Sequence, residues 1–174
     1  MLKLQQAKPQ DLDAIMQFYY EVIEIMDGMT YQPGWIKDVY PTRDYILSSI
    51  EAHEFYLAYV GDEIACATML NHHCSEGYDT VAWPTAASPE EIFVIHALGV
   101  HPKFQGTGLS RKLLAAIMDL CRKEGGKVIR IDVLGNNIPA QILYPKVGFA
   151  YVDTLKLYYD NTGLADFLLY ELVL

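Results

Sequence analysis

The chain has 174 residues, of which 52% are hydrophobic and 20% charged, and a net charge of −9. This composition is typical of a globular protein and excludes a disordered chain. The acidic balance argues against a nucleic-acid-binding protein, which needs a basic surface. The length predicts one domain over residues 1–174. No apolar run reaches the roughly 18 residues that cross a bilayer, and no signal peptide is recognisable, so we expect a cytoplasmic protein with no membrane partner.

Acidic and basic residues are unevenly distributed along the chain. Residues 1–100 contain 4 Lys and Arg against 15 Asp and Glu, whereas residues 101–174 contain 9 against 7. This asymmetry fits a protein whose first part meets a cationic group and whose second part meets a polyanion. Ordinary solvated surface charge explains the same numbers.

The cysteines and a histidine pair give no sign of a metal site. Cys66, Cys74 and Cys121 are odd in number and lack C-x-x-C spacing, which argues against a disulfide framework and against zinc. His72 and His73 are neighbours in a predicted strand, where adjacent side chains point to opposite faces. We therefore expect no metal.

Apolar spacing and turn residues divide the chain into helices and strands. The elements predicted, in chain order, are a strand at 2–7, a helix at 12–26, a helix ending near 52 behind the N-cap candidate Thr42, a hairpin at 55–73 that turns at 61–63, a buried strand at 91–100, a helix at 108–124, a strand at 127–134, a short helix at 136–146 and a closing strand pair at 148–174. A long loop covers 74–90. This order predicts an α/β domain with one mixed sheet.

The segment QGTGLS, residues 105–110, lies between the buried strand at 91–100 and the helix that follows it. Glycines at this place allow backbone amides to turn toward a phosphate at a helix N-terminus. A tight turn that only feeds the helix is the alternative. The segment is neither a P-loop nor a G-x-G-x-x-G motif, because no Lys-Ser/Thr follows Gly108 and Arg111 stands where the third glycine belongs.

Two motifs carry a resemblance to a known family. The segment V-x-P-x-F-Q-G-x-G-L-S-x-x-L-L resembles the acetyl-CoA signature Q/R-x-x-G-x-G/A of the GNAT superfamily of N-acetyltransferases, with Ser110 in place of the final Gly or Ala. A second segment is similar to another signature of the superfamily, at the expected distance. Its matching residues are Asn137, Ala140, Tyr144, Lys146, Gly148 and Phe149. The resemblance implies the GNAT fold, a mixed but mostly antiparallel sheet flanked by helices, with a splayed central strand pair.

The resemblance also implies where acetyl-CoA, the co-substrate, would bind. In this family the strand before the glycine turn carries a bulge, for which Gly99 is the candidate here, and splays to admit the pantetheine arm. The amides of the turn would hold the pyrophosphate, and Arg111 either reaches phosphate or is a solvated helix residue. The cofactor-binding residues expected are Leu98, Val100, Gln105, Gly106, Thr107, Gly108, Leu109, Ser110, Arg111 and Asn137.

Tyr144 matches the position of the family's general acid, which protonates the departing thiolate. A tyrosine on a short helix can equally be a core residue, and Pro145 disfavours the helical conformation of the residue before it. Tyr144 is nevertheless the predicted acid.

The general base is less clearly marked in the sequence. Many relatives place a glutamate where this chain has Val94, so the usual carboxylate is missing. His96 lies on the same strand face and titrates near neutrality, which makes it the predicted base. The alternatives are a core histidine at 96, Glu90 or Glu91 acting through water, or no strong base at all.

Aromatic residues in the loops predict the acceptor pocket. The residues expected to contact the amine are Tyr31, Trp35, Tyr40 and Trp83. In such loops aromatics also serve simply to anchor the chain to the core. The function predicted is direct transfer of acetyl from acetyl-CoA to a primary amine of a small molecule or peptide. A non-catalytic acyl-CoA-binding module on the same fold is the alternative, and a homodimer is a further possibility.

Overall fold

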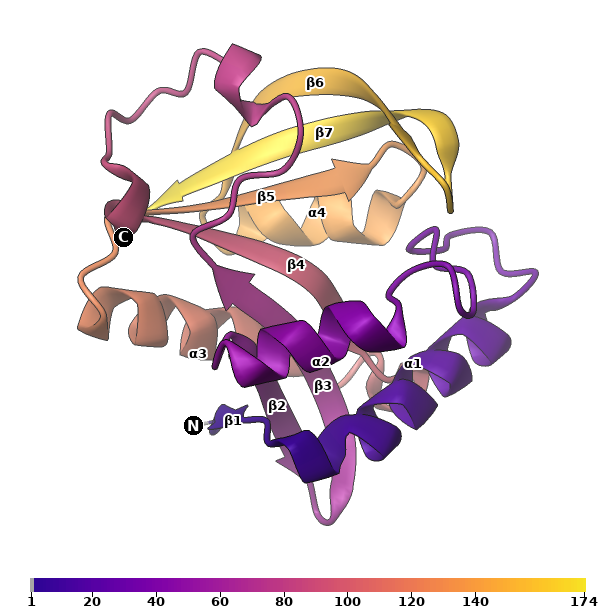
Figure 1. Cartoon of the computed structure of the whole chain (residues 1–174). Coiled ribbons are helices and arrows are strands. Elements are labelled where there is room, and N and C mark those ends of the chain that lie inside the picture. The colour runs from indigo at the N-terminus through magenta and orange to yellow at the C-terminus, as the bar shows by residue number, and fades with distance from the viewer. Residues whose placement is uncertain (1) are drawn as a thin grey trace.

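We describe residues 2–174 of a computed structural model of the chain. Seven strands form one sheet in the order β1-β2-β3-β4-β5-β7-β6, and every neighbouring pair is antiparallel except β4 and β5. Helices lie on both faces, with α1 and α2 in front of the sheet and α3 and α4 behind it in Figure 1. The strands are β1 (Gln5–Gln6), β2 (Phe55–Val60), β3 (Glu63–Asn71), β4 (Ile92–Val100), β5 (Val128–Leu134), β6 (Ala150–Tyr159) and β7 (Gly163–Val173). The helices are α1 (Leu12–Met26), α2 (Arg43–Glu51), α3 (Leu109–Lys123) and α4 (Ile138–Lys146).

Each long helix buries one apolar stripe against the sheet. The stripe of α1 packs with α2 on one face, and the stripe of α3 packs with α4 on the other. The Thr42 hydroxyl accepts a hydrogen bond from the amide of Tyr45 at 3.1 Å, which caps α2 as predicted. The residues buried in α1 and α3 are Leu12, Ile15, Met16, Phe18, Tyr19, Val22, Leu109, Leu113, Leu114, Ala116, Ile117 and Cys121.

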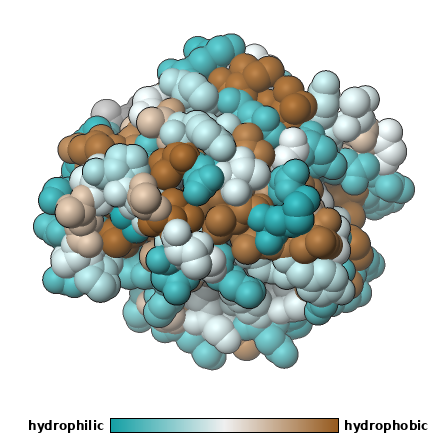
Figure 2. All heavy atoms as spheres, turned by 90° about the horizontal axis from the view of Figure 1, so that it is seen from above, coloured by the Kyte–Doolittle hydropathy of each residue, from teal (hydrophilic) through white to brown (hydrophobic). Residues whose placement is uncertain are grey.

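The loop at residues 72–91 covers a third apolar cluster. Tyr78 and Val81 of this loop pack with Val94, Val128 and Leu169 of the sheet. Figure 2, which views the molecule from above Figure 1, shows hydrophobic residues at the surface between hydrophilic ones. Within the described part of the chain, no helix has the length and apolar character required to cross a membrane.

Candidate active site

The two parallel strands at the centre of the sheet diverge. Pairing between β4 and β5 runs only from Ile92–Val128 to Val94–Arg130, although both strands continue well beyond. The β5-facing edge of β4 therefore has no strand partner after Val94, and the two ribbons separate in Figure 1. The splayed central pair that the resemblance implied is confirmed.

A cavity of about 720 Å³ occupies the place where the strands separate. It is lined by Ile95 to Leu98 of β4 and by Ile131 to Leu134 of β5, with α2, α4 and the β6–β7 turn around them. The structure thus brings together six residues predicted for three different roles. They are Tyr144 and His96 for catalysis, Leu98 and Asn137 for the cofactor, and Trp35 and Tyr40 for the acceptor.

The bulge in β4 lies two residues before its expected position. In the pairing with β3, Gly99 lies opposite Ala67 and His96 lies opposite Met69. Ala97 and Leu98 of β4 therefore both lie opposite the single residue Thr68 of β3. The expectation of a bulge at Gly99 was therefore wrong. Ala97 has a positive φ of 49°, and its carbonyl accepts a hydrogen bond from the buried Tyr19 hydroxyl at 2.6 Å, which stabilises the distortion.

Gly99 has a packing role instead. A Cβ at this position would lie 3.1 Å from the ring of Phe18 and 3.1 Å from the ring of Trp35. The missing side chain thus lets the Trp35 indole approach the strand and reach the cavity wall.

Tyr144 lies on α4, and its side chain reaches the cavity. The residue is only 5% exposed, yet none of the hydrogen bonds among residues 2–174 involves its hydroxyl. Burial, and next the charge of Asp132, raise the pKa of the phenol, so it keeps its proton through the neutral range. Pro145 does not displace it, because α4 continues through Tyr144 to Lys146. Because every fully buried polar side-chain atom among residues 2–174 has a partner, the unpaired Tyr144 hydroxyl opens onto the cavity and is available to a ligand.

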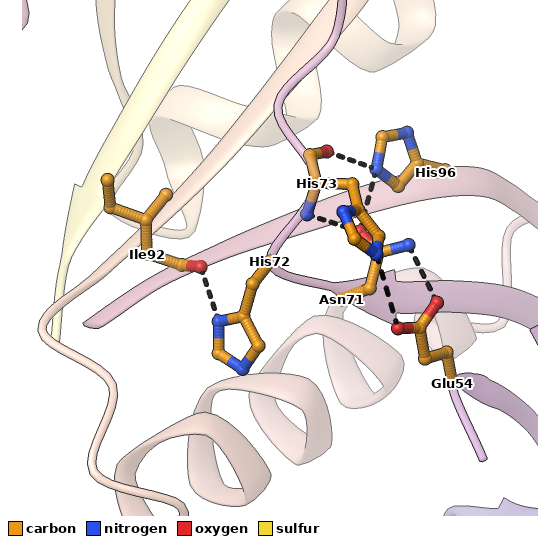
Figure 3. Close-up of polar contacts among 6 residues, drawn as sticks. All are labelled: Glu54, Asn71, His72, His73, Ile92 and His96. Atoms are coloured by element: carbon orange, nitrogen blue, oxygen red, sulfur yellow. Dashed lines mark hydrogen bonds and ion pairs between the residues drawn. The ribbon is translucent and has the colours of Figure 1, made fainter. Parts of the chain in front are cut away.

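The neutral ring of His96 is held in one tautomer by its neighbours (Figure 3). Its Nε2 lies 3.1 Å from Oδ1 of Asn71 and 3.1 Å from the carbonyl oxygen of His73. The Asn71 amide nitrogen donates to Glu54 at 2.9 Å, which fixes Oδ1 toward His96. Both partners of Nε2 are acceptors, so Nε2 carries the proton of the neutral ring and Nδ1 is the free acceptor.

The environment of His96 favours the neutral ring. Burial lowers its pKa, and this effect outweighs the opposing charge of Asp132 and the hydrogen bond to the His73 carbonyl. Neutral imidazole is the form that accepts a proton. Glu90 and Glu91, the alternative bases, lie at the start of β4 and are not among the residues that line the cavity.

The glycine turn presents free amides at the start of α3. Gly106 and Gly108 both have φ of 77°, a conformation that favours glycine, and a Cβ at either would meet open space. Within residues 2–174 no acceptor pairs with the amides from Gly106 to Arg111, and the first helical bond starts at Lys112. Such a run of unpaired, exposed amides is suited to a pyrophosphate. Gln105 and Arg111 are exposed beside it.

Replacing Gly108 by valine is expected to abolish acetyl-CoA binding in a folded protein. A β-branched residue tolerates this φ poorly, at a cost of about 1–2 kcal/mol, and its side chain would project into the open space beside the amides. The matched control is Gly125→Val at the other end of α3, where φ is 83° and the space is also open. Calorimetric titration should show binding for Gly125→Val only; binding by both would contradict the role of the turn.

Two of the predicted acceptor residues are not brought to the cavity. Trp83 donates its indole N–H to the carbonyl of Tyr78 at 2.8 Å and lies under the guanidinium of Arg130, 4.1 Å from the ring centre. It anchors the loop at 72–91 to the sheet. Tyr31 is 41% exposed and is likewise absent from the lining. Among the predicted cofactor residues, Val100 and the glycine turn at 105–111 also lie outside the lining.

Asp132, a central residue of the cavity, was not predicted. It lies on the splayed part of β5, and its carboxylate accepts a hydrogen bond from the Tyr78 hydroxyl at 2.9 Å. It shares the cavity lining with His96 and Tyr144, and its charge adds to the rise in the pKa of Tyr144 and opposes the lowering of the pKa of His96. An acidic residue within the apolar run VIRIDVL was the signal that could have identified it.

Glu54 and Asn71, which hold His96, were also missed by the sequence analysis. They meet because β2 and β3 form one hairpin, which brings Glu54, just before β2, to Asn71 at the end of β3, and because β3 pairs with β4, which carries His96. No local sequence pattern predicts that these residues come into contact. In the described part of the chain, no group of three or more His, Cys, Asp or Glu side chains is arranged to hold a metal ion.

Residues 19–149 match the model of the Acetyltransferase (GNAT) family. This span is most of the chain, so the protein belongs to that family. It is similar to the N-alpha-acetyltransferase RimI of Mycobacterium tuberculosis, 36% identical over 76 residues, which are 44% of this chain and 46% of the relative. It is 30% identical to the ribosomal protein bS18-alanine N-acetyltransferase of Haemophilus ducreyi over 93 residues, 53% of this chain and 64% of that one. The chain thus spans less than two thirds of each relative.

Solved structures share the whole fold. An acetyltransferase of the GNAT family from Streptococcus agalactiae superposes with a TM-score of 0.82 at 20% identity, covering 99% of this chain and 95% of that one. A putative acetyltransferase from Salmonella typhimurium, solved with its cofactor acetyl-CoA, gives 0.70 at 18% identity and covers 99% and 94%. At these identities the likeness concerns the fold.

Proposed function

We propose that the protein is an acetyl-CoA-dependent N-acetyltransferase that acetylates a primary amine by direct transfer. The observation that carries the proposal is the cavity between β4 and β5, which joins Tyr144, His96 and Asp132 at the point where the sheet opens. The names of the relatives, an N-alpha-acetyltransferase, a ribosomal protein bS18-alanine N-acetyltransferase and a mycothiol acetyltransferase, support the same reaction class.

The residues present fit acetyl-CoA. The unpaired amides from Gly106 to Arg111 would hold the pyrophosphate, and the unpaired edge of β4 at Leu98 would run beside the pantetheine arm. Asn137 has a different duty, because its side chain caps α4 by accepting from the amide of Ala140 at 3.4 Å. When bound, acetyl-CoA supplies an acetyl group activated as a thioester.

The side chains around the cavity would accept and donate the protons of the reaction. Nδ1 of His96 would take a proton from the incoming ammonium. The hydrogen bonds at Nε2 keep the proton of the neutral ring on Nε2, which leaves Nδ1 free to accept. The Tyr144 hydroxyl would donate a hydrogen bond to the departing sulfur. The Asp132 carboxylate would attract the ammonium and stabilise the imidazolium that forms at His96.

The first test is a calorimetric titration with acetyl-CoA, followed by release of the CoA thiol in the presence of primary amines. Saturable binding and amine-dependent thiol release would support the enzyme. Binding without release for any amine, including a peptide with an N-terminal alanine, would instead indicate the non-catalytic acyl-CoA-binding module.

The pH dependence tests His96. Because burial lowers its pKa below the ordinary value of about 6.5, the neutral base is present above that lowered pKa and is lost as pH falls through it. We expect kcat/KM to rise with pH on a limb centred below 6.5. His96→Gln should remove this limb and lower the plateau by about 10²-fold. His53→Asn, an exposed histidine outside the cavity, is the control; an unchanged profile in His96→Gln would rule His96 out as the base.

A further inference from the structure

We propose that the acceptor is a small amine that carries a second positive charge and no carboxylate, such as an α,ω-diamine. This inference rests on the proposed function and concerns the same cavity. Three carboxylates line that cavity, those of Glu54, Glu76 and Asp132, whereas no lysine or arginine is among its lining residues. A neutral lining would not discriminate between amines by charge, whereas this acidic lining favours an amine with a second positive charge.

The three carboxylates are not neutralised by the protein. Among residues 2–174, no ion pair joins any of them to a lysine or arginine, and the nearest basic side chain is the imidazole of His73, 3.8 Å from Glu54. Among the described residues, the Tyr78 hydroxyl is the one hydrogen-bond partner of the Asp132 side chain, which lies half-buried on the splayed part of β5. An unpaired carboxylate in such a place is stabilised by a bound cation.

A second feature of the cavity points to a ligand independently of the acids. The Tyr144 hydroxyl is an unpartnered donor on a side chain that is 5% exposed, and it belongs to the same lining. The reacting end of a substrate would lie beside this donor and His96. The three carboxylates are then available to bind the non-reacting end of the substrate.

The other walls of the cavity suit an alkyl chain that ends in a cation. Aromatic faces bind both methylene groups and ammonium ions, the latter through the negative charge of the ring face. The acceptor-side aromatic residues in the lining are Trp35, Tyr40, Tyr45, Tyr159 and Phe167.

Among the described residues, the cavity lining has no lysine or arginine and no free helix N-terminal amide with which to bind a substrate carboxylate. The one helix that begins at its wall is α4, and the amides of its first turn are already used or missing. The Asn137 amide pairs with Leu134, the Ile138 amide with Asn136, and the Ala140 amide with the Asn137 side chain, while Pro139 has none. A free amino acid would therefore bring an unpaired carboxylate next to three others, which opposes binding.

The test compares three amines of nearly equal length. They are 1,5-diaminopentane, hexylamine and 6-aminohexanoate, which end in a cation, a methyl group and an anion. We expect kcat/KM for the diamine to exceed that for hexylamine by roughly tenfold or more, and that for 6-aminohexanoate by roughly 100-fold, the range of a charged hydrogen bond gained or a repulsion added. The preference should shrink with added salt.

Substitution of Asp132 separates its charge from its shape. Asp132→Asn retains an oxygen that can accept from the Tyr78 hydroxyl, so it should lower kcat/KM for the diamine more than for hexylamine and reduce the ratio between them. Asp79→Asn makes the same change on the nearby loop at a residue outside the cavity, and it should leave the ratio unchanged.

The outcomes distinguish this inference from the proposed function. Equal rates for the three amines, or a preference for 6-aminohexanoate, would overturn the inference and leave the N-acetyltransferase standing. If the protein acetylated a peptide with an N-terminal alanine but none of the three small amines, the inference would likewise be overturned and the N-acetyltransferase would stand. Acetyl-CoA binding without acetylation of any acceptor would overturn both.

Discussion

Replacing Tyr144 by phenylalanine is expected to lower kcat by about 10²- to 10⁴-fold, the range for loss of a positioned acid. The phenol hydroxyl lies next to the opening of β4 and β5 and keeps its proton at neutral pH, since burial raises its pKa. The change removes one oxygen and leaves the ring in place. Steady-state kinetics with saturating acetyl-CoA measures the effect.

Binding and stability should be nearly untouched in the same variant. The Tyr144 hydroxyl has no protein partner among the described residues, so its removal leaves no donor or acceptor unsatisfied. Tyr151→Phe is the control, because Tyr151 lies exposed on β6 outside the cavity. If Tyr144→Phe retained half or more of the wild-type kcat, the acid would have to be sought elsewhere or the departing sulfur would need none.

The sequence predicted the helices and strands well because their signals are local. The apolar spacing placed one helix at 12–26, where α1 lies, and another at 108–124, where α3 covers Leu109–Lys123. The exception is the first strand, expected over 2–7 and found only at Gln5–Gln6. Its extent depends on how far β2 pairs with it, and β2 meets it only at Leu57 and Tyr56.

The site was predictable where a family motif, a strand face or the aromatic residues of a loop marked it. Tyr144 and Leu98 came from the family pattern and His96 from alternation along β4, and all three line the cavity. The bulge was misplaced because the glycine in β4 serves the close approach of Trp35, and the distortion falls on Ala97 instead. A glycine in a strand indicates that another group packs closely against the backbone, but the sequence does not identify that group.

The charged residues show the limit of sequence reasoning most clearly. Asp132 and Arg130 are two apart on β5, so their side chains lie on the same face of the sheet. One enters an open cavity and the other a closed cluster beneath the loop at 72–91. Splaying of β4 begins just after Val94–Arg130, and this tertiary feature alone decides that Asp132 is available to a substrate and Arg130 is not.

Replacing Arg130 by methionine is expected to lower the free energy of unfolding by about 3–5 kcal/mol. Arg130 pairs with Glu171 on the neighbouring strand at 3.0 Å, and the two side chains are 7% and 3% exposed. Glu171 also accepts from the Thr85 amide at 3.1 Å, so the pair holds the loop to the sheet. Methionine would leave the Glu171 carboxylate buried without its cation. Urea unfolding measures the loss.

Two further variants show whether desolvation of Glu171 is the cause. Arg130→Met combined with Glu171→Leu should recover much of the stability, because a buried pair replaced by apolar residues leaves no charge behind. Arg43→Met breaks the exposed pair with Asp13 and should have little effect, because solvent screens it. A loss in Arg130→Met no larger than in Arg43→Met would show that the pair is not desolvated. In that case the loop that carries Glu76 and Tyr78 to the cavity would depend on its apolar contacts alone.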